Sequence, residues 1–113
     1  MHETSLALSL VDLVAQRARA EGARAVRRVA VAVGALGHVE PEALAFALQS
    51  ARNGGLLADT AFDIRVVPGR AFCFDCADLV EISERGADCP RCGGARLTPA
   101  AGEELKVTEM EIV

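Results

Sequence analysis

Aromatic residues are scarce in this sequence, which has no tryptophan, no tyrosine and only four phenylalanines in 113 residues. Half of the residues are nevertheless apolar (51%), so a core has to be built from Ala, Val, Leu and Ile. Lysine occurs once, at Lys106, and the other eleven basic residues are arginine. The net charge of −4 argues against tight binding to a nucleic-acid backbone, because such binding neutralises several phosphates with basic side chains.

Long apolar runs are also missing. No stretch approaches the ~18 residues that a membrane-spanning helix needs, so we expect no membrane span. Residues 1–20 lack the basic start of a secretory signal and carry Glu3, Asp12, Arg17 and Arg19. We therefore expect a soluble, cytoplasmic protein, and in that reducing compartment paired cysteines are metal ligands rather than disulfides.

Catalytic side chains are few. The only histidines are His2 and His38, and the only four cysteines lie in motifs of metal-ligand spacing, so no nucleophile with a nearby base can be assembled. The loop from Gly34 to Gly37 lacks the Gly-Lys-Ser/Thr ending of a phosphate-binding loop. The sequence therefore predicts a protein that is not an enzyme.

Hydrophobic periodicity predicts five elements around a cysteine-rich segment. Leu6, Leu10, Leu13, Val14 and Ala18 recur at helical spacing and form the predicted buried stripe of the first helix. The expected elements are a helix over 4–21, a strand over 25–34, a helix from Pro41 that ends before Asn53, and strands over 61–67 and 104–113.

The last strand has a change in its alternation. Strict alternation would place Leu105 and Val107 on one face and Met110 and Ile112 on the other, so we predict a β-bulge near Thr108–Glu109. Together the elements predict an α/β fold, with two helices packed on a three-stranded sheet in the order helix, strand, helix, strand, zinc ribbon, strand. The predicted domains are 1–69 plus 99–113, and an inserted zinc ribbon over 70–98.

Two cysteine pairs carry the strongest chemical signal. Cys73-x-x-Cys76 and Cys89-x-x-Cys92 are separated by twelve residues, a spacing typical of two turns that close on one tetrahedral Zn²⁺. A pair of redox dithiols would leave the symmetric arrangement unexplained. Four protein ligands leave no open position, so we expect a structural ion. It would stabilise a segment too short to fold alone by on the order of 10–16 kcal/mol.

The amino terminus offers a second metal site. The Met1 α-amine, the amide nitrogen and imidazole of His2, and the amide nitrogen of Glu3 can form a planar set of four nitrogens that suits Ni(II) or Cu(II). The Glu3 carboxylate can instead orient the imidazole. A histidine at position 2 is more often an exposed terminus, so on these residues alone both interpretations stay open. His38 is typical of a surface histidine, and Glu40 of a carboxylate at a helix start.

Taken together, these motifs resemble the HypA/HybF family of nickel metallochaperones over essentially the whole chain. The resemblance rests on Met1-His2-Glu3, Val31–Gly34, Val39–Leu44, the four cysteines and Leu105–Ile112. It implies an α/β nickel domain with an inserted zinc ribbon, nickel at His2 with Met1 and Glu3 as further donors, and zinc at Cys73, Cys76, Cys89 and Cys92. Glu40 falls where members carry an acidic residue linked to nickel binding.

The resemblance also implies function and partners. These are Ni(II) delivery for [NiFe]-hydrogenase maturation, partnership with the maturation GTPase HypB and the hydrogenase large subunit, and in some organisms a urease accessory protein. The sequence departs from the family at Ala35, where many members are acidic, and at Ala77 and Gly93, where some members carry histidine beside the cysteines.

Two other functions stay open on the sequence. One is a zinc-ribbon module that binds nucleic acid, although residues 70–98 carry four arginines against five acidic residues. The other is a zinc-stabilised interaction adaptor in which His2 is incidental. The apolar Leu79, Val80 and Ile82 are candidate docking contacts, and we expect a monomer or a weak homodimer.

Overall fold

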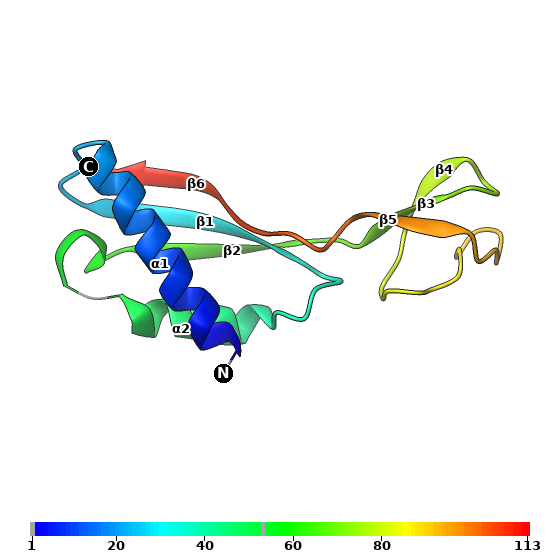
Figure 1. Cartoon of the computed structure of the whole chain (residues 1–113), viewed down its shortest axis with the longest axis horizontal. Helices are drawn as coiled ribbons and strands as arrows, with labels where there is room; N and C mark the ends of the chain where they lie inside the picture. The colour runs from blue at the N-terminus through cyan, green and yellow to red at the C-terminus, as the bar shows by residue number, and fades with distance from the viewer. Residues whose placement is uncertain (1, 53) are drawn as a thin grey trace. The chain divides into compact units, whose positions relative to one another are not determined.

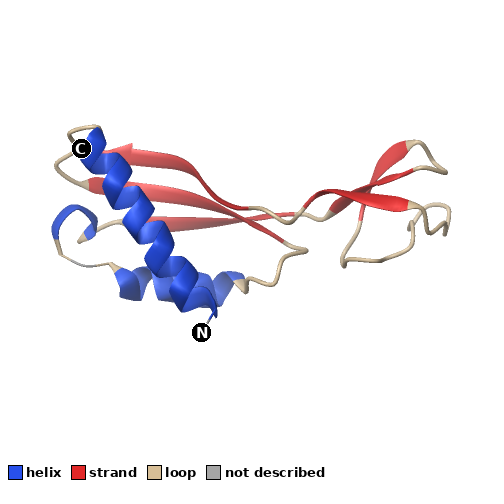
Figure 2. Cartoon of the chain, in the orientation of Figure 1, coloured by secondary structure: helices blue, strands red, loops and turns tan. Residues whose placement is uncertain are grey.

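The computed structural model describes residues 2–52 and 54–113, so two predictions, the Met1 amine and the helix stop at Asn53, fall outside the described residues. The structure has two helices, a short 3₁₀ turn and two three-stranded sheets, ordered β2-β1-β6 and β4-β3-β5 (Figures 1 and 2). The elements are α1 (His2–Ala20), β1 (Val26–Gly34), α2 (Pro41–Ala51), η1 (Gly55–Leu57), β2 (Ala61–Val67), β3 (Arg70–Cys73), β4 (Asp78–Glu81), β5 (Leu97–Ala101) and β6 (Leu105–Ile112). The predicted fold class is confirmed.

The chain packs as two compact units. The first comprises Met1–Ala32, Val39–Arg65 and Lys106–Val113, and the second comprises Val33–His38 and Val66–Leu105. The predicted domains, 1–69 plus 99–113 and 70–98, stay a prediction. A domain is a part of the chain that can fold independently, whereas the two units are defined only by close packing.

The core of the first unit lies where α1 packs against α2. Leu44 and Leu48 of α2 are completely buried. On α1 the buried residues are Ala7, Leu10, Val11, Val14, Ala15 and Ala18. The prediction was wrong for Leu13, which is 56% exposed, because the buried stripe is rotated toward Val11 and Ala15.

Main-chain bonds show how β6 pairs with β1. The N–H of Gly34 donates to the carbonyl of Glu104, and the N–H of Val113 donates to the carbonyl of Ala25. The residue numbers rise along one strand as they fall along the other, so the two strands are antiparallel. The last segment of the chain thus completes the sheet of the first unit, as the sequence predicted.

β2 lies on the other side of β1 and runs parallel to it. The Thr60 hydroxyl, which is buried, donates to the Val26 carbonyl at 2.7 Å, and the N–H of Ala35 donates to the Val67 carbonyl at 2.9 Å. The residue numbers rise in the same direction along β1 and β2, so the two strands are parallel. The segment that contains α2 and η1 forms the crossover connection that a parallel pair requires.

The predicted bulge in β6 follows from the same bonds. Glu104 and Val113 both direct their main-chain groups to β1, and alternate residues of a strand point the same way. The two positions are an odd number of residues apart, so the alternation breaks once between them. Glu109 and Glu111 both contact Arg28, whereas Val107 and Met110 line one hollow, which places the break beside Thr108. Accordingly, the Thr108 hydroxyl donates to the carbonyl of Ala30 on β1.

The second unit is built on β3, which pairs antiparallel with β4 and β5. Its apolar cluster combines ribbon residues with Leu36, which comes from the loop after β1. Backbones approach closely here: a Cβ on Gly34 would lie 2.0 Å from the carbonyl oxygen of Gly102. The buried cluster members are Leu36, Ala71, Cys73, Val80, Ile82 and Cys89.

Candidate metal sites

The four cysteine sulfurs converge in the second unit, all within 4.8 Å of one another. The Sγ atoms of Cys73 and Cys92 are 3.7 Å apart, and those of Cys76 and Cys89 are 3.8 Å apart. A tetrahedral ion with Zn–S bonds of about 2.3 Å sets its sulfurs about 3.8 Å apart, whereas a disulfide needs about 2 Å. The thiols are not disulfide-bonded, and their arrangement fits a tetrahedral zinc ion.

Turn geometry positions these sulfurs. Cys73 ends β3, Cys76 lies in the turn to β4, and the second pair lies between β4 and β5. Main-chain N–H groups of Cys76, Arg91 and Gly94 donate to the sulfurs of Cys73, Cys89 and Cys92, each at 3.4 Å. Such donors favour thiolates and orient them toward a shared ion.

The residue after each pair adopts a left-handed conformation. Ala77 has φ 55° and Gly93 has φ 74°, so the two turns use the same backbone shape with different side chains. In the second turn the N–H of Gly93 donates to the Cys89 carbonyl at 2.8 Å.

Without an ion, four sulfurs this close cannot all hold a charge. Hydrogen bonding with the Cys92 thiol, together with burial, raises the pKa of Cys76 to about 12. The main-chain N–H of Cys92 lowers the pKa of Cys89 to about 7. A divalent cation bound by the four sulfurs would favour loss of the thiol protons.

The surroundings of the cysteines correct one prediction. Leu79 is half-exposed, but Val80 and Ile82 are 5% and 7% exposed and belong to the apolar cluster, so these two are not docking contacts. Phe72 and Phe74 stack edge to face at 5.2 Å beside the first pair.

The predicted nickel residues begin α1. His2 is the first helical residue, its side chain is 58% exposed, and its Nδ1 lies 3.7 Å from Oε2 of Glu3. The N–H of Glu40 donates to the Glu3 carboxylate at 3.2 Å and is the main cause that lowers the pKa of Glu3. Glu40 in turn caps α2, because its carboxylate accepts from the N–H of Ala43 at 2.6 Å. The contact between Glu3 and Glu40 joins the starts of the two helices.

Across residues 2–52 and 54–113, the four cysteines form the one group of three or more His, Cys, Asp or Glu side chains that could hold an ion. His38 is exposed and belongs to the second unit. His2 and Glu3 are consecutive residues at the start of α1, and main-chain nitrogens would have to complete a metal site there.

The similarity to known proteins extends over essentially the whole chain. The sequence model of one family, described as hydrogenase/urease nickel incorporation, metallochaperone, hypA, matches residues 1–112. The chain belongs to the HypA family. It is 44% identical over 112 residues to the hydrogenase maturation factor HypA of Rhodopseudomonas palustris strain TIE-1, covering 99% of both chains. It is 39% identical over 113 residues to that of Rhizobium leguminosarum bv. viciae, covering 100% of both.

Solved structures show the HypA fold as well. The solution structure of the Ni metallochaperone HypA from Helicobacter pylori matches with a TM-score of 0.68 and 22% identity, covering 98% of this chain and 97% of that one. A second solution structure of a HypA protein matches with a TM-score of 0.73 and 23% identity, covering 100% and 97%. At these identities the likeness concerns the fold.

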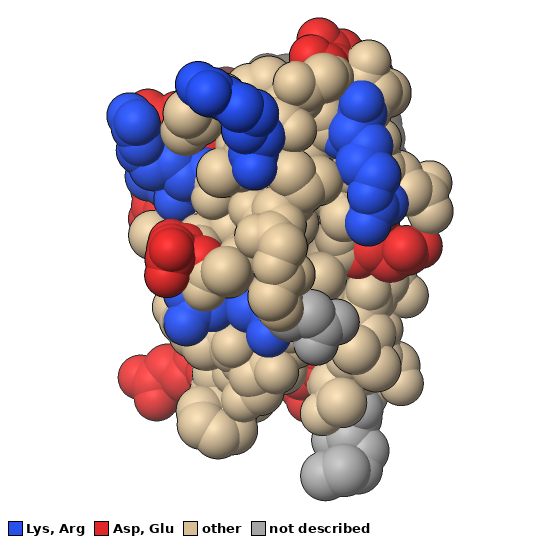
Figure 3. All heavy atoms as spheres, turned by 90° about the vertical axis from the view of Figure 1, so that its left-hand side faces the viewer, with Lys and Arg blue, Asp and Glu red and all other residues tan. Residues whose placement is uncertain are grey.

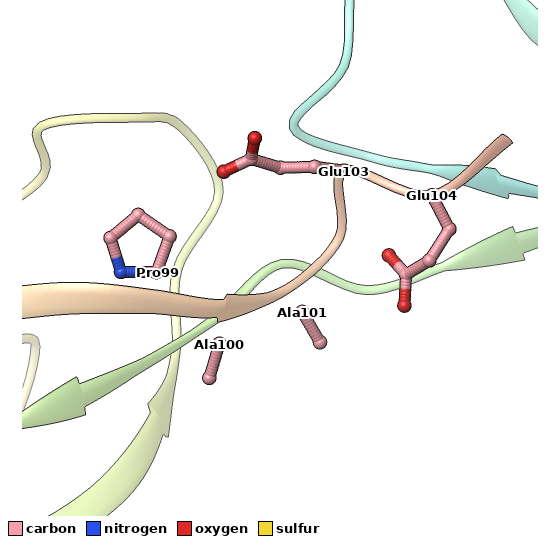
Figure 4. Close-up of a pocket in the computed structure, with 5 residues that line it drawn as sticks. All are labelled: Pro99, Ala100, Ala101, Glu103 and Glu104. Carbon is pink, nitrogen blue, oxygen red and sulfur yellow. The ribbon is translucent and has the colours of Figure 1, made fainter.

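This HypA-family chain also has a hollow of about 410 Å³, which is lined by Pro99, Ala100, Ala101, Glu103 and Glu104 (Figure 4). Its two carboxylates do not form a second metal site. Figure 4 shows them pointing in different directions, Glu103 pairs with Arg85, and Glu104 accepts from the N–H of Gly102.

The surface of the HypA-family chain shows no basic tract on the face in Figure 3, where arginines and acidic residues form separate small groups among uncharged ones. In residues 2–52 and 54–113, no helix has the length and apolarity to cross a membrane.

Proposed function

We propose that this HypA-family chain is a nickel metallochaperone that binds Ni(II) through the Met1 amine, His2 and Glu3. It delivers the metal for maturation of the [NiFe]-hydrogenase large subunit, in the cytoplasm, together with the GTPase HypB. A urease accessory protein is a further recipient. The family match over residues 1–112, whose description names nickel incorporation, carries the proposal.

The start of α1 supports a site for nickel as cargo. The first N–H groups of a helix have no intrahelical carbonyl partner, so the amides of His2 and Glu3 can lose their protons to a metal without breaking the helix. The imidazole of His2 is exposed, so a metal ion in solution can bind to it directly. A site at a chain end also releases its ion with little repacking, which suits a protein that must pass the metal on.

We further propose that zinc binds the four cysteines and has a structural role. Cys73 and Cys89 are buried among the apolar residues of the second unit, and thiolates buried there need a cation to compensate them. When bound, the ion supplies a fixed point that joins both turns. The surrounding residues hold the sulfurs in place through three main-chain N–H donors.

A nickel titration on untagged protein tests the nickel site. Planar coordination by nitrogen gives Ni(II) a characteristic absorption, and we expect His2→Ala to abolish it while zinc content and circular dichroism stay unchanged. His38→Ala is the matched control, because it removes the other histidine, and it should leave the titration unaltered. Unchanged nickel affinity in His2→Ala would refute the site.

An added residue before Met1 gives an independent test. It converts the α-amine into an amide and leaves His2 and Glu3 in place, so we expect weaker nickel binding and a lost planar spectrum. Cys89→Ser should lower zinc content below one ion per chain. Full zinc content in that variant would contradict the four-sulfur site.

A further inference from the structure

β6 is an edge strand. In the sheet β2-β1-β6 it pairs with β1 on one side, and among the described residues no strand pairs with its outer side (Figure 1). Because Glu104, Val113 and the bulge residues Thr108–Glu109 direct their main-chain groups to β1, the intervening residues direct theirs outward. These outward residues are Leu105, Val107, Met110 and Ile112.

The same residues form an apolar strip beside the open edge. Val107 and Met110 line a hollow of about 260 Å³ together with Leu13, Val14 and Arg17 of α1. Leu13 is 56% exposed, and Ile112 is 40% exposed. The edge therefore offers unpaired main-chain groups and an uncovered apolar surface in one place, which is the arrangement that an added strand fills.

We propose that this edge binds the β6 edge of a second copy of the chain. The two strands run antiparallel about a two-fold axis that passes between Thr108 and Glu109, and the two sheets join into one. In this register Val107 faces Met110 of the second copy, and Leu105 faces Ile112. All four are outward-directed, so each pair can exchange main-chain hydrogen bonds, about eight in all.

The bulge is what makes this register possible. Residues directly opposite each other in a sheet project to the same face, yet Val107 and Met110 would lie on opposite faces of a regular strand. Here both line the hollow beside α1, because the bulge between them changes the alternation. A shift by one residue would set Val107 against Glu109 or Glu111, which direct their main-chain groups to β1, and the bonds would be lost.

Charges on the other face identify the partner as a second copy. Lys106 is exposed. In the proposed register it faces Glu111 of the second copy, and symmetry repeats the pair. One oxygen of Glu111 contacts Arg28 at 3.3 Å, on the face opposite α1, so the carboxylate lies on the same side as Lys106. The strand is thus complementary to itself in both apolar pattern and charge.

A lysine and a bulge on an edge strand can also serve to prevent association, and experiment separates the two roles. Sedimentation of the untagged, zinc-loaded chain from micromolar to near-millimolar concentration should show a reversible dimer. Lys106→Glu and Glu111→Lys should each weaken dimerisation about tenfold or more, because each replaces two attractive pairs with two repulsive ones. Mixing the two variants should restore a heterodimer, since every introduced charge then faces its opposite.

Two further variants control for folding and charge. Met110→Pro removes one outward N–H and keeps the bonds to β1, so the dimer should disappear with unchanged circular dichroism. Arg19→Glu makes the same charge change as Lys106→Glu on the side of α1 that borders α2, and it should not alter association. A chain that stays monomeric throughout, or a dimer that ignores both charge reversals, overturns the proposal, as does failure of the mixed variants to associate.

Discussion

Exchanging the residues that follow the two cysteine pairs should move zinc affinity in opposite directions. Ala77 and Gly93 both have positive φ, 55° and 74°, but only glycine adopts this conformation without strain. A Cβ at Gly93 would meet no atom within 4 Å, so Gly93→Ala tests the backbone alone. Ala77→Gly is the reverse change in the turn that already carries the side chain.

The magnitude follows from two opposing contributions. A left-handed conformation costs an alanine about 1–2 kcal/mol, whereas replacing glycine by alanine restricts the unfolded chain and recovers about 0.4–1 kcal/mol. We therefore expect Gly93→Ala to destabilise the metal-bound fold by about 0.5–1 kcal/mol, and Ala77→Gly to stabilise it by a similar amount. Because a structural metal site and the fold around it are thermodynamically linked, the apparent zinc dissociation constant should change about two- to fivefold in each direction.

Competition with a chromophoric chelator measures these constants directly. Gly54→Ala is the control, since Gly54 has φ −57° and a Cβ there would also meet no atom within 4 Å. It should leave zinc affinity unchanged. Two substitutions that shift zinc affinity in the same direction would refute the argument from backbone conformation.

Other expected outcomes concern the core and the surface charges. Leu48→Ala empties a fully buried position between the helices and should lower the unfolding free energy by about 2–5 kcal/mol in denaturant titrations. Thr60→Val leaves the Val26 carbonyl without its donor and should cost about 1–3 kcal/mol in the same assay, whereas a neutral result would contradict that bond. The Arg65 guanidinium lowers the pKa of Glu109, so this carboxylate contributes stability above its ordinary pKa of 4.5 and loses it as the pH falls through the lowered value. A carboxyl NMR titration should find Glu109 below 4.5, and a midpoint at or above that value would oppose the prediction.

Elements with strong local signals could be predicted from the sequence. The strand over 61–67 has the predicted bounds, and α2 starts at Pro41, because alternation and the helix-start proline are properties of neighbouring residues. The parity change in β6 was also visible, since four apolar residues broke a strict alternation. Leu13 was misplaced because helical spacing alone does not fix where the centre of the buried stripe lies.

Contacts between distant segments could not be predicted in this way. The loop after β1 is glycine-rich and has no pattern that links it to the ribbon, yet Leu36 packs with Cys73 and Cys89. Val80 and Ile82 were mistaken for surface residues because nothing near them in the sequence indicates what covers them. The convergence of the four cysteines was predictable, since the spacing of the ligands fixes the turns. The contact of Glu3 with the N–H of Glu40 depends on tertiary packing of two helix starts.

Because Leu36 packs in the ribbon's apolar cluster, loss of the metal should also affect residues outside the ribbon. Its side chain belongs to the same apolar cluster as Cys73 and Cys89, while its N–H donates to the carbonyl of Gly102 and its carbonyl accepts from Arg85. If a chelator removes the cation, the four sulfurs rearrange, and the Leu36 side chain loses part of its packing. Loss of order would then extend to the end of β1, so we expect removal of a cysteine-bound ion to loosen the backbone near Gly34 as well.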